Sequence, residues 1–524
     1  MLSLVQTNPF QPLSQQRINV ILTPQIDALI AGATAKAEEL SKIRITVISS
    51  TSHGGGVSEM LHSVVPLLNN LAIKCRWLLF SPPAATSESF FQLTKGLHNA
   101  IHNSSSCSSP DFSSSQTLFQ SVGDEAAEHF FSHFMEPLEG VTEIIIIHDP
   151  QPISMARRLR LLLPAAKLVW RCHIGSDRVT PVSQAAWDFL FPYIVDYDTA
   201  VFSSPVYLPP RFPLKRVSYI SPCIDPSSAK NRELSFYDTC SILHRSGLVD
   251  EVPLSLPSCG LVEMPFTHSA TLYFGKNVWR GRNSYPTSTS APHNPHMSVP
   301  FFSRPVISQV SRWDRLKGFE GLLHGFHQLK STGEEVGLKK GEDASAEATI
   351  CNCHLLLVGP DPLKVRDDPE GAECLRELCR AYDALPSYTQ AMISIVCLPM
   401  DDPTENALIV NAIQRSSFLM VQNSYEEGWG LTALESMYKR CPVVASSTAV
   451  GLRSQIQDGH TGILITNPSD PRSVASALRF ALTHREIKST VAYNGQCRAV
   501  KSGLIYSQVG AWLSLLLHWP SPLG

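Results

Sequence analysis

One segment of the chain combines two glutamates with a glycine-flanked loop that leads into a helix. Glu427-Gly428-Trp429-Gly430-Leu431 runs directly into a stretch of helical periodicity that carries Glu435. Backbone amides beside the two glycines can approach an anionic phosphate, and the start of a helix adds about half a positive charge. Glu427 and Glu435 would then bind hydroxyl groups on either side of the phosphate. The pattern suits a sugar phosphate, although two solvated acids on a helix flank are an equal alternative for this segment alone.

A second candidate group contains two basic residues. Arg312 and Lys317 lie in the run 311–318, where a strand-like apolar stretch gives way to a helical one. Two cations at such a junction can neutralise a departing diphosphate, a task that a magnesium ion performs in some enzymes. Surface basic residues paired with Asp314 or Glu320 are the alternative, and it is favoured for this pair taken by itself.

A glycine loop follows the first strand-like run of the chain. Gly54, Gly55 and Gly56 precede a helical stretch that carries Glu59 in its first turn. Three glycines let the backbone come close to a ligand. The loop matches neither G-x-G-x-x-G nor a P-loop, so by itself it is weak evidence for a site.

Polar residues also end two later strand-like runs of the first half. Asp149 and Gln151 follow one run, and His173 ends the next. Because the carboxyl ends of parallel strands meet at one edge of a sheet, these side chains should point into the same cleft, although a core or surface role is favoured for any single histidine among the eighteen. The run Asp196-Tyr197-Asp198 has a metal-binding form, but it precedes an apolar run away from the phosphate loops, and we interpret it as structural. No metal site is predicted.

The elements that must position these groups alternate between strand-like and helical stretches. This alternation predicts an α/β fold with two Rossmann-like, doubly wound parallel-sheet domains and a cleft between the carboxyl ends of their strands. The predicted strands are 45–48, 75–80, 143–148, 168–173 and 199–203, followed by 305–310, 354–358, 393–398, 418–422, 442–445 and 462–465.

The predicted boundaries follow from this pattern and from composition. Residues 1–43 form an N-terminal extension, 44–225 the first Rossmann-like domain and 304–490 the second. Residues 226–303 collect Ser, Thr and Pro and lose the periodicity, so they are predicted to be a linker or insertion. Residues 491–524 are predicted to form a helix that packs back on the first domain.

Length and composition exclude several other classes. With 524 residues the chain exceeds the ~250 to 300 residues of a single core. A net charge of -3 offers no basic footprint for nucleic acid. The apolar stretch 504–519 is shorter than the ~20 residues of a membrane span, so no membrane association is predicted. The cysteines lack paired spacing and the amino terminus lacks a signal-peptide pattern, which predicts a cytoplasmic protein.

Taken together, these residues resemble a known family. Glu427 and Glu435 match the E-x7-E pattern of the retaining glycosyltransferases of family 4, which have the GT-B fold of two Rossmann-like domains. More closely, the chain resembles the glycosyltransferring trehalose synthases and the trehalose phosphorylases. The runs that carry this second resemblance are 54–68, 90–95, 98–100, 148–152, 170–174, 311–318 and 411–415.

The resemblance implies a role for each candidate residue. Arg312 and Lys317 would bind the donor phosphate, Glu427 the hydroxyls of the donor sugar, and Glu435 the nucleotide ribose. His173 would lie near the reacting carbon and join Arg312, Lys317 and Glu427 as catalytic residues. The implied donor site also includes Gly55, Gly56, Gly428, Trp429, Gly430 and Leu431, and the acceptor site Glu59, Asp149 and Gln151.

The implied activity is reversible, metal-independent transfer of glucose, with retention, from a nucleotide-glucose to glucose, which gives trehalose. Domain 44–225 would bind the acceptor and domain 304–490 the donor. No cofactor is implied, since the nucleotide-glucose is a co-substrate. Two alternatives stay open: a trehalose phosphorylase that uses glucose 1-phosphate, and an inactive protein that only binds a sugar or a nucleotide-sugar. The expected partners are these small molecules, with a homodimer as a further expectation.

Overall fold

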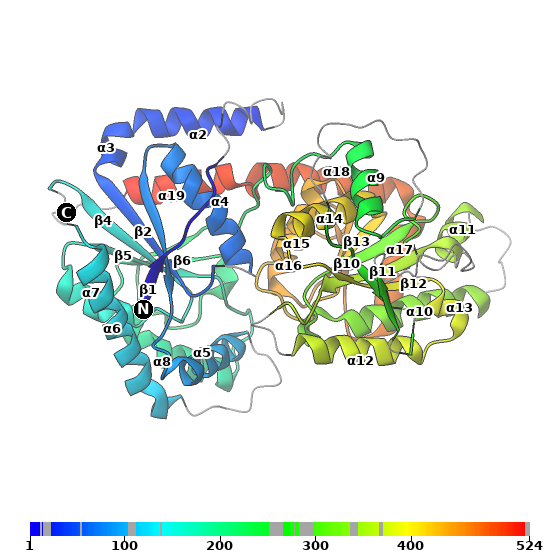
Figure 1. Ribbon diagram of the computed structural model, residues 1–524, viewed down its shortest axis with the longest axis horizontal. Helices are drawn as coiled ribbons and strands as arrows, with labels where there is room; N and C mark the ends of the chain where they lie inside the picture. Colours follow the sequence, from blue (N-terminus) through cyan, green and yellow to red (C-terminus); the bar gives the residue numbers. More distant parts are fainter. Residues whose placement is uncertain are drawn as a thin grey trace. The chain divides into compact units, whose positions relative to one another are not determined.

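The structure is a computed structural model that describes residues 1–10, 13, 22–52, 55–102, 112–136, 139–250, 266–273, 275–276, 278–281, 298–335, 344–365 and 370–518. The chain forms two compact units. Unit 1 consists of Met1–Asp225 and Ser502–Gly524, and unit 2 consists of Pro226–Lys501 (Figure 1).

Unit 1 contains a seven-stranded sheet in the order β1-β3-β2-β4-β5-β6-β7. Its pairs are parallel except for the edge strand β1, which runs antiparallel to β3. Strand β4 carries four consecutive isoleucines, 144–147, all buried, because helices cover both faces of a central parallel strand. The strands are β1 (Leu2–Leu4), β2 (Ile43–Ser49), β3 (Lys74–Phe80), β4 (Thr142–His148), β5 (Lys167–Cys172), β6 (Thr199–Phe202) and β7 (Val217–Tyr219).

Helices lie on both faces of this sheet, with α4, α2 and α19 on one face and α5 to α8 on the other (Figure 1). Helix α19 follows unit 2 in the chain and returns to unit 1, where a bridge joins Ile224 to Leu504. The helices are α2 (Thr23–Ala35), α3 (Ala37–Ser41), α4 (Gly56–Asn70), α5 (Ser87–Ile101), α6 (Gln116–Phe134), α7 (Met155–Leu162), α8 (Pro181–Ile194) and α19 (Ile505–Leu517).

Unit 2 contains an eight-stranded sheet in the order β15-β14-β13-β10-β11-β12-β8-β9. The six strands from β10 to β15 are parallel, whereas β8 and β9 continue the sheet antiparallel beyond β12. The strands are β8 (Thr271–Tyr273), β9 (Trp279–Gly281), β10 (Val306–Val310), β11 (His354–Pro360), β12 (Ile393–Leu398), β13 (Leu419–Gln422), β14 (Val443–Ser446) and β15 (Ile463–Ile465).

The helices of unit 2 begin at local sequence signals. Asp402 and Asp470 accept backbone N–H groups at the starts of α14 and α17, and a proline occupies the first helical position of each. The helices are α9 (Phe236–Arg245), α10 (Phe319–Glu335), α11 (Ala344–Asn352), α12 (Gly371–Asp383), α13 (Ser387–Gln390), α14 (Pro403–Ser416), α15 (Leu431–Tyr438), α16 (Val450–Gln455), α17 (Pro471–Thr483) and α18 (Arg485–Ser502).

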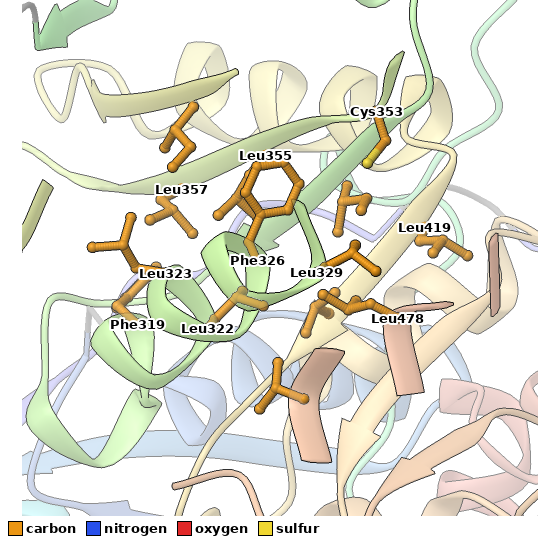
Figure 2. Close-up of a cluster of buried hydrophobic side chains, with 14 of the residues drawn as sticks. Phe319, Leu322, Leu323, Phe326, Leu329, Cys353, Leu355, Leu357, Leu419 and Leu478 are labelled. Carbon is orange, nitrogen blue, oxygen red and sulfur yellow. The ribbon is translucent and has the colours of Figure 1, made fainter. Parts of the chain in front are cut away.

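In the core of unit 2, the apolar face of one helix packs against the sheet. Helix α10 presents one apolar face to strands β10, β11 and β13 and to helix α17 (Figure 2). Its residues recur every three or four positions, the spacing of one helix face. They are Phe319, Leu322, Leu323, Phe326 and Leu329, which pack against Leu355, Leu357, Leu419 and Leu478.

The α/β class with two parallel-sheet domains is confirmed, and every predicted strand is present to within one or two residues at its ends. The ranges predicted as extension and linker also contain regular structure. Residues 1–43 include β1, α2 and α3, and residues 226–303 include α9, β8 and β9, which lie in unit 2. Through the residues that the structure describes, no helix is both long and apolar enough to cross a membrane. The cleft between the domains stays a prediction.

Candidate functional site

The predicted donor residues of unit 2 follow two strands that are neighbours in its sheet. Among the parallel strands of unit 2, β10 comes first in the chain, and β11 and β13 pair with its two sides, so the strand order reverses between β10 and β13. Open α/β sheets bind ligands beside the carboxyl ends of the strands at such a reversal. The loop 311–318 follows β10 and the loop 423–430 follows β13, so both begin at this edge.

Hydrogen bonds hold these two loops together. Gln309 donates to the Lys317 carbonyl at 2.8 Å and accepts the Asn423 N–H at 3.0 Å. The Asn423 amide donates to the Gly318 carbonyl at 3.0 Å. Gly318 has a φ of 64°, and an added Cβ would lie 2.2 Å from the Asn423 carbonyl oxygen. A glycine is therefore required directly after Lys317.

Lys317 and Glu427 meet across the two loops. Lys317 Nζ lies 2.7 Å from Glu427 Oε2, and the two side chains are 15% and 17% exposed. Ser424 Oγ also donates to this carboxylate oxygen, at 3.4 Å. Solvent reaches the pair only partly, so its charges are screened less than those of a surface pair. Arg312 lies on the same loop as Lys317 and is exposed.

The glycine loop after Glu427 is closely packed where it enters α15. Gly430 adopts a left-handed conformation with a φ of 84°, and Leu431 begins the helix. Gly451 lies beneath the loop, where an added Cβ would be 2.5 Å from Trp429 Cα. The Trp429 indole N–H is buried and has no partner among the described residues. The start of α15 and Lys317 together supply a local positive potential for an anion.

Glu435 lies one turn into α15 and is only 2% exposed. Its Oε2 accepts from Gln414 Nε2 at 2.9 Å, and its Oε1 lies 3.5 Å from Lys230 Nζ. Burial opposes ionisation, but Lys230, Lys439 and the Gln414 hydrogen bond outweigh it and lower the pKa of the carboxyl. Glu435 is therefore an ionised carboxylate held inside a polar cluster.

In unit 1, two histidines lie together at the carboxyl ends of β4 and β5. His148 Nδ1 and His173 Nε2 are 3.1 Å apart, and His173 Nδ1 lies 3.0 Å from Ser203 Oγ. Burial lowers the pKa of His148 to about 3 and holds the pKa of His173 well below its usual value, with the Arg171 cation adding to both shifts. Both rings are neutral at physiological pH, and one donates its proton to the other.

Asp149 directly follows β4, with a φ of 59°. Its Oδ1 accepts the His173 backbone N–H at 2.8 Å, and its carbonyl accepts the Trp170 indole N–H at 3.0 Å. Burial raises the pKa of Asp149 to about 6, against the opposing effects of the His173 N–H and of Arg171. Asp149 and His173, both predicted site residues, are therefore joined by a hydrogen bond.

The remaining predicted residues of unit 1 lie at the same edge of its sheet. Gly55 precedes α4, and Gly56 and Glu59 lie in its first turn, where Glu59 is exposed. Gln151 follows β4, and its side-chain oxygen is buried without a partner in the described part of the chain. His53 and Gly54 of the predicted glycine loop lie outside the described residues.

The D-x-D run, which was interpreted as structural, makes its contacts within unit 1. Asp196 pairs with Arg157 at 3.4 Å and Asp198 pairs with Arg160 at 2.9 Å, and Asp198 also accepts the Leu168 N–H at 2.8 Å. Within the described ranges, no three or more His, Cys, Asp or Glu side chains group closely enough to share a metal ion.

Sequence reasoning missed several residues that contact the predicted ones. Ser203 lies beside His173, and Gln414 and Lys230 contact Glu435. Ser203 ends a predicted strand of the first sheet, so its position at the edge that carries His173 was a usable signal. Gln414 lies within helix α14 and Lys230 within the predicted linker, and neither has a local pattern that points to Glu435.

Two family descriptions match the chain. The family described as "Trehalose synthase, N-terminal domain" matches residues 47–209, and "Glycosyl transferases group 1" matches residues 404–498. The first match covers β2 to β6 of unit 1, and the second covers the segment of unit 2 that holds Glu427 and Glu435.

The chain is also similar to characterised relatives. It is 27% identical to a trehalose synthase of Pyrococcus horikoshii, over 92% of this chain and 91% of the relative. It is 27% identical to a trehalose synthase of Rubrobacter xylanophilus, over 84% and 83% of the two chains. A trehalose phosphorylase of Pleurotus sajor-caju is 24% identical over 84% of this chain but only 53% of its own length.

Solved structures share the fold. A trehalose-6-phosphate synthase superimposes with a TM-score of 0.62 at 14% identity, covering 91% of this chain and 99% of its own. A sucrose-phosphate synthase of Thermosynechococcus elongatus gives 0.56 at 16% identity, covering 90% and 99%. At these identities the likeness extends to the architecture alone.

Proposed function

Since the chain is a GT-B glycosyltransferase related to the trehalose synthases over most of its length, we propose that it transfers glucose from a nucleotide-glucose to glucose and forms trehalose. The transfer retains the anomeric configuration and needs no metal. The bond from the donor C1 to the phosphate oxygen breaks, and C1 bonds to the anomeric hydroxyl oxygen of the acceptor on the same face. The acceptor proton passes to the leaving phosphate, and a nucleoside diphosphate is released.

The pairing of Lys317 with Glu427 at the strand reversal of unit 2 carries this proposal. Lys317 and Arg312 neutralise the charge that grows on the leaving diphosphate, together with the backbone amides of the 428–430 loop. Glu427 binds hydroxyls of the donor sugar and fixes its orientation beside the phosphate site. Positive charge and fixed dipoles at the leaving group supply the stabilisation that a metal ion provides elsewhere.

The acceptor is assigned to unit 1. His173 would lie near the reacting carbon, where a neutral imidazole can hydrogen-bond a sugar hydroxyl without adding charge. Asp149, Gln151 and Glu59 would bind acceptor hydroxyls. The Asp149 contact with the His173 backbone supports this assignment, because it fixes the histidine in the same loop cluster as the acid.

Trehalose phosphorylase is the second candidate, because a trehalose phosphorylase also matches most of this chain. A nucleotide donor needs a group for its ribose, and the ionised Glu435 carboxylate is the proposed group. Glucose 1-phosphate has no ribose and makes no such demand. The greater length over which the synthases match the chain supports the nucleotide donor.

Product analysis with separate donors tests the proposal. Purified protein is incubated with glucose and, in turn, UDP-glucose, ADP-glucose, GDP-glucose or glucose 1-phosphate, and the products are identified by chromatography and anomeric NMR. Trehalose from a nucleotide donor is expected. Trehalose from glucose 1-phosphate alone would make the protein a phosphorylase, and binding of a nucleotide-glucose without any product would make it a binding protein. Activity after EDTA treatment checks metal independence.

We also infer a cytoplasmic location. Free thiols at each cysteine of the described ranges support it, because a reducing compartment keeps such thiols reduced. The reaction requires neither nucleic acid nor a membrane. A homodimer stays an expectation that analytical ultracentrifugation would test.

A further inference from the structure

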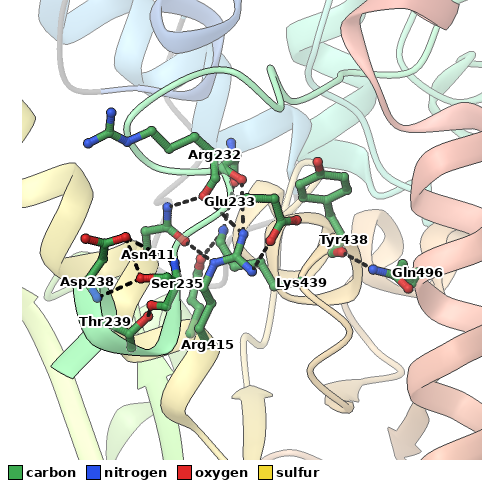
Figure 3. Close-up of polar contacts among 12 residues, drawn as sticks. Arg232, Glu233, Ser235, Asp238, Thr239, Asn411, Arg415, Tyr438, Lys439 and Gln496 are labelled. Carbon is green, nitrogen blue, oxygen red and sulfur yellow. Dashed lines mark hydrogen bonds and ion pairs between the residues drawn. The ribbon is translucent and has the colours of Figure 1, made fainter. Parts of the chain in front are cut away.

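A buried polar cluster links helix α15 to the chain segment with which unit 2 begins. Glu435 and Lys439 lie on one side of α15, one helical turn apart. Gln414 comes from α14, and Lys230 and Asn231 come from the segment 228–233. Figure 3 shows Lys439 among Arg232, Glu233 and Arg415 of this neighbourhood.

Lys439 dictates how Gln414 is oriented. Lys439 Nζ donates to Gln414 Oε1 at 2.6 Å, and Gln414 Nε2 donates to Glu435 Oε2 at 2.9 Å. An ammonium group can only donate, so the amide must turn its oxygen to Lys439 and its nitrogen to Glu435. Without that cation, only the Glu435 carboxylate, which can accept but not donate, would orient the amide.

The Lys439 ammonium also binds the segment 228–233, with which unit 2 begins. Lys439 Nζ donates to Asn231 Oδ1 at 2.8 Å. Asn411 donates to the carbonyls of Ala229 and Arg232 at 3.0 and 2.9 Å, and Arg415 donates to the Arg232 carbonyl at 3.0 Å. These hydrogen bonds hold the residues on both sides of Lys230, which itself ion-pairs with Glu435.

We propose that Lys439 is a positioning residue for donor binding, which acts through Gln414 to hold the Glu435 carboxylate ready for a nucleoside diphosphate donor. The inference rests on the proposed function, because it takes Glu435 as a donor ligand. It assigns no contact between Lys439 and the donor, since the lysine is only 8% exposed and its ammonium is occupied by two amide oxygens.

The charge of Lys439 depends on pH near neutrality. Its pKa is lowered to about 7, chiefly by burial and also by the cations Arg415 and Lys230, against the opposing effects of Glu435 and the Cys441 thiol. Loss of the proton above this pKa leaves an amine that keeps two N–H donors but can also accept a hydrogen bond, so the constraint on Gln414 is weakened. Nucleotide affinity should therefore decrease as the pH rises through about 7.

Calorimetric binding of UDP, ADP and GDP to the full-length protein tests the inference without relying on turnover. At pH 6.5, K439M is expected to weaken binding of the preferred nucleotide by about tenfold or more, the scale of a hydrogen bond to a charged group. In the wild type the affinity should fall between pH 6.5 and 8.5, and in K439M it should stay flat. Q414L is expected to weaken binding similarly, and the double variant should lose little more.

Lys330 provides the matched control. It is also a lysine of unit 2 with 8% exposure, and it donates to the carbonyls of Ile350, Cys351 and Cys353. K330M should lower stability but keep the nucleotide affinity and its pH dependence. If K439M does not fold, Q414L carries the same test without removing a charge.

The outcomes separate this inference from the proposed function. Wild-type affinity in K439M, an equal loss in K330M, or an unchanged pH profile in K439M would overturn the positioning role. A wild-type protein that binds no nucleoside diphosphate would also overturn it. Nucleotide binding that depends on Lys439, in a protein that makes no trehalose, would support the positioning role while refuting the proposed acceptor reaction.

Discussion

At the scale of single residues, Lys317 and Glu427 carry the chemistry assigned to unit 2. Replacing Lys317 by Met removes the cation that is proposed to face the leaving group and leaves Glu427 without its ion-pair partner. Because this charge matters most when the phosphate departs, kcat should fall by about 10² or more, with a smaller change in donor KM. Initial rates at saturating donor and acceptor measure the effect.

Arg315 supplies the control for that substitution. It lies two residues earlier on the same loop, is 56% exposed and pairs with Glu377 at 2.8 Å. R315M removes the same charge from the same turn, so wild-type turnover is expected. Equal losses in R315M and K317M would mean that the loop needs only its overall charge, and the assigned role of Lys317 would fail.

The histidine pair of unit 1 predicts acid sensitivity. The folded pKa of His148 is about 3 and that of His173 is well below 6.5, both chiefly through burial. The stability from these neutral rings is present above pH 6.5 and is lost as the pH falls, because only the unfolded state gains protons. Asp149 has the opposite effect on the pH dependence of stability, because its pKa is raised from 3.8 to about 6. The stability that its protonated carboxyl contributes is fully present below pH 3.8 and is lost as the pH rises through 6.

As the pH falls from 6.5 to 5, the two histidines lose more stability than Asp149 gains. The free energy of unfolding should therefore decrease over this range. Urea denaturation followed by circular dichroism at both pH values measures the loss, and H148Q should reduce it. A variant H148Q with the full wild-type pH dependence would show that other groups govern the acid sensitivity of unit 1.

At the scale of elements, the 427–430 loop depends on a glycine at its junction with α15. Gly430 has a φ of 84°, and a Cβ there would lie 2.5 Å from Leu452 Cδ2 and 3.1 Å from Glu427 Cγ. G430A must therefore displace Leu452 and Glu427 or the loop itself, and donor affinity should fall together with the stability.

Gly459 provides a control that distinguishes the effect of backbone strain from that of the steric clash at Gly430. It is also left-handed, with a φ of 68°, but an added Cβ would meet nothing within 4 Å. G459A should cost about 1 kcal/mol of unfolding free energy, the backbone strain alone, and leave nucleotide affinity unchanged. Equal donor affinities in G430A and G459A, measured by calorimetry, would contradict a role for the loop in the site.

The same elements show what sequence alone could reveal. The long parallel strands were predictable because both their faces are buried, as in the isoleucine run of β4, and this leaves a continuous apolar signal. Strands β1, β7, β8 and β9 were missed, because each has only three residues, too few to establish a period.

The sequence could place Lys317, Glu427 and Gly430 in loops at one edge of the sheet, because each lies beside a strand or helix boundary. The cluster around Glu435 could not be predicted. Lys439 and Asn231 are 208 positions apart and meet only in the folded unit. Buried polar pairs of this kind follow no local periodicity, so their partners emerge only from tertiary structure.

At the scale of the whole molecule, the chain passes between the units twice, near residues 225 and 501. Unit 2 is one continuous segment with its own apolar clusters, so residues 226–501 should fold alone. Unit 1 needs both ends of the chain. Helix α19 and the residue before it bury Leu504, Ile505, Val509, Trp512, Leu513 and Leu516, each at most 6% exposed.

Residues 1–225 alone should therefore fail to fold stably. Burying such a side chain contributes roughly 1.5 to 3 kcal/mol, so losing six costs as much as, or more than, the roughly 5 to 15 kcal/mol that typically stabilises a domain. A short linker can reconnect α19 to unit 1, because the two chain segments are already adjacent. Ile224 N–H donates to the Gly503 carbonyl at 2.9 Å, and Ile505 N–H donates to the Ile224 carbonyl at 3.0 Å. A brief linker from residue 225 to 502 should restore a cooperative thermal transition by circular dichroism. An equally cooperative transition in 1–225 alone would show that α19 only covers a unit that is already stable.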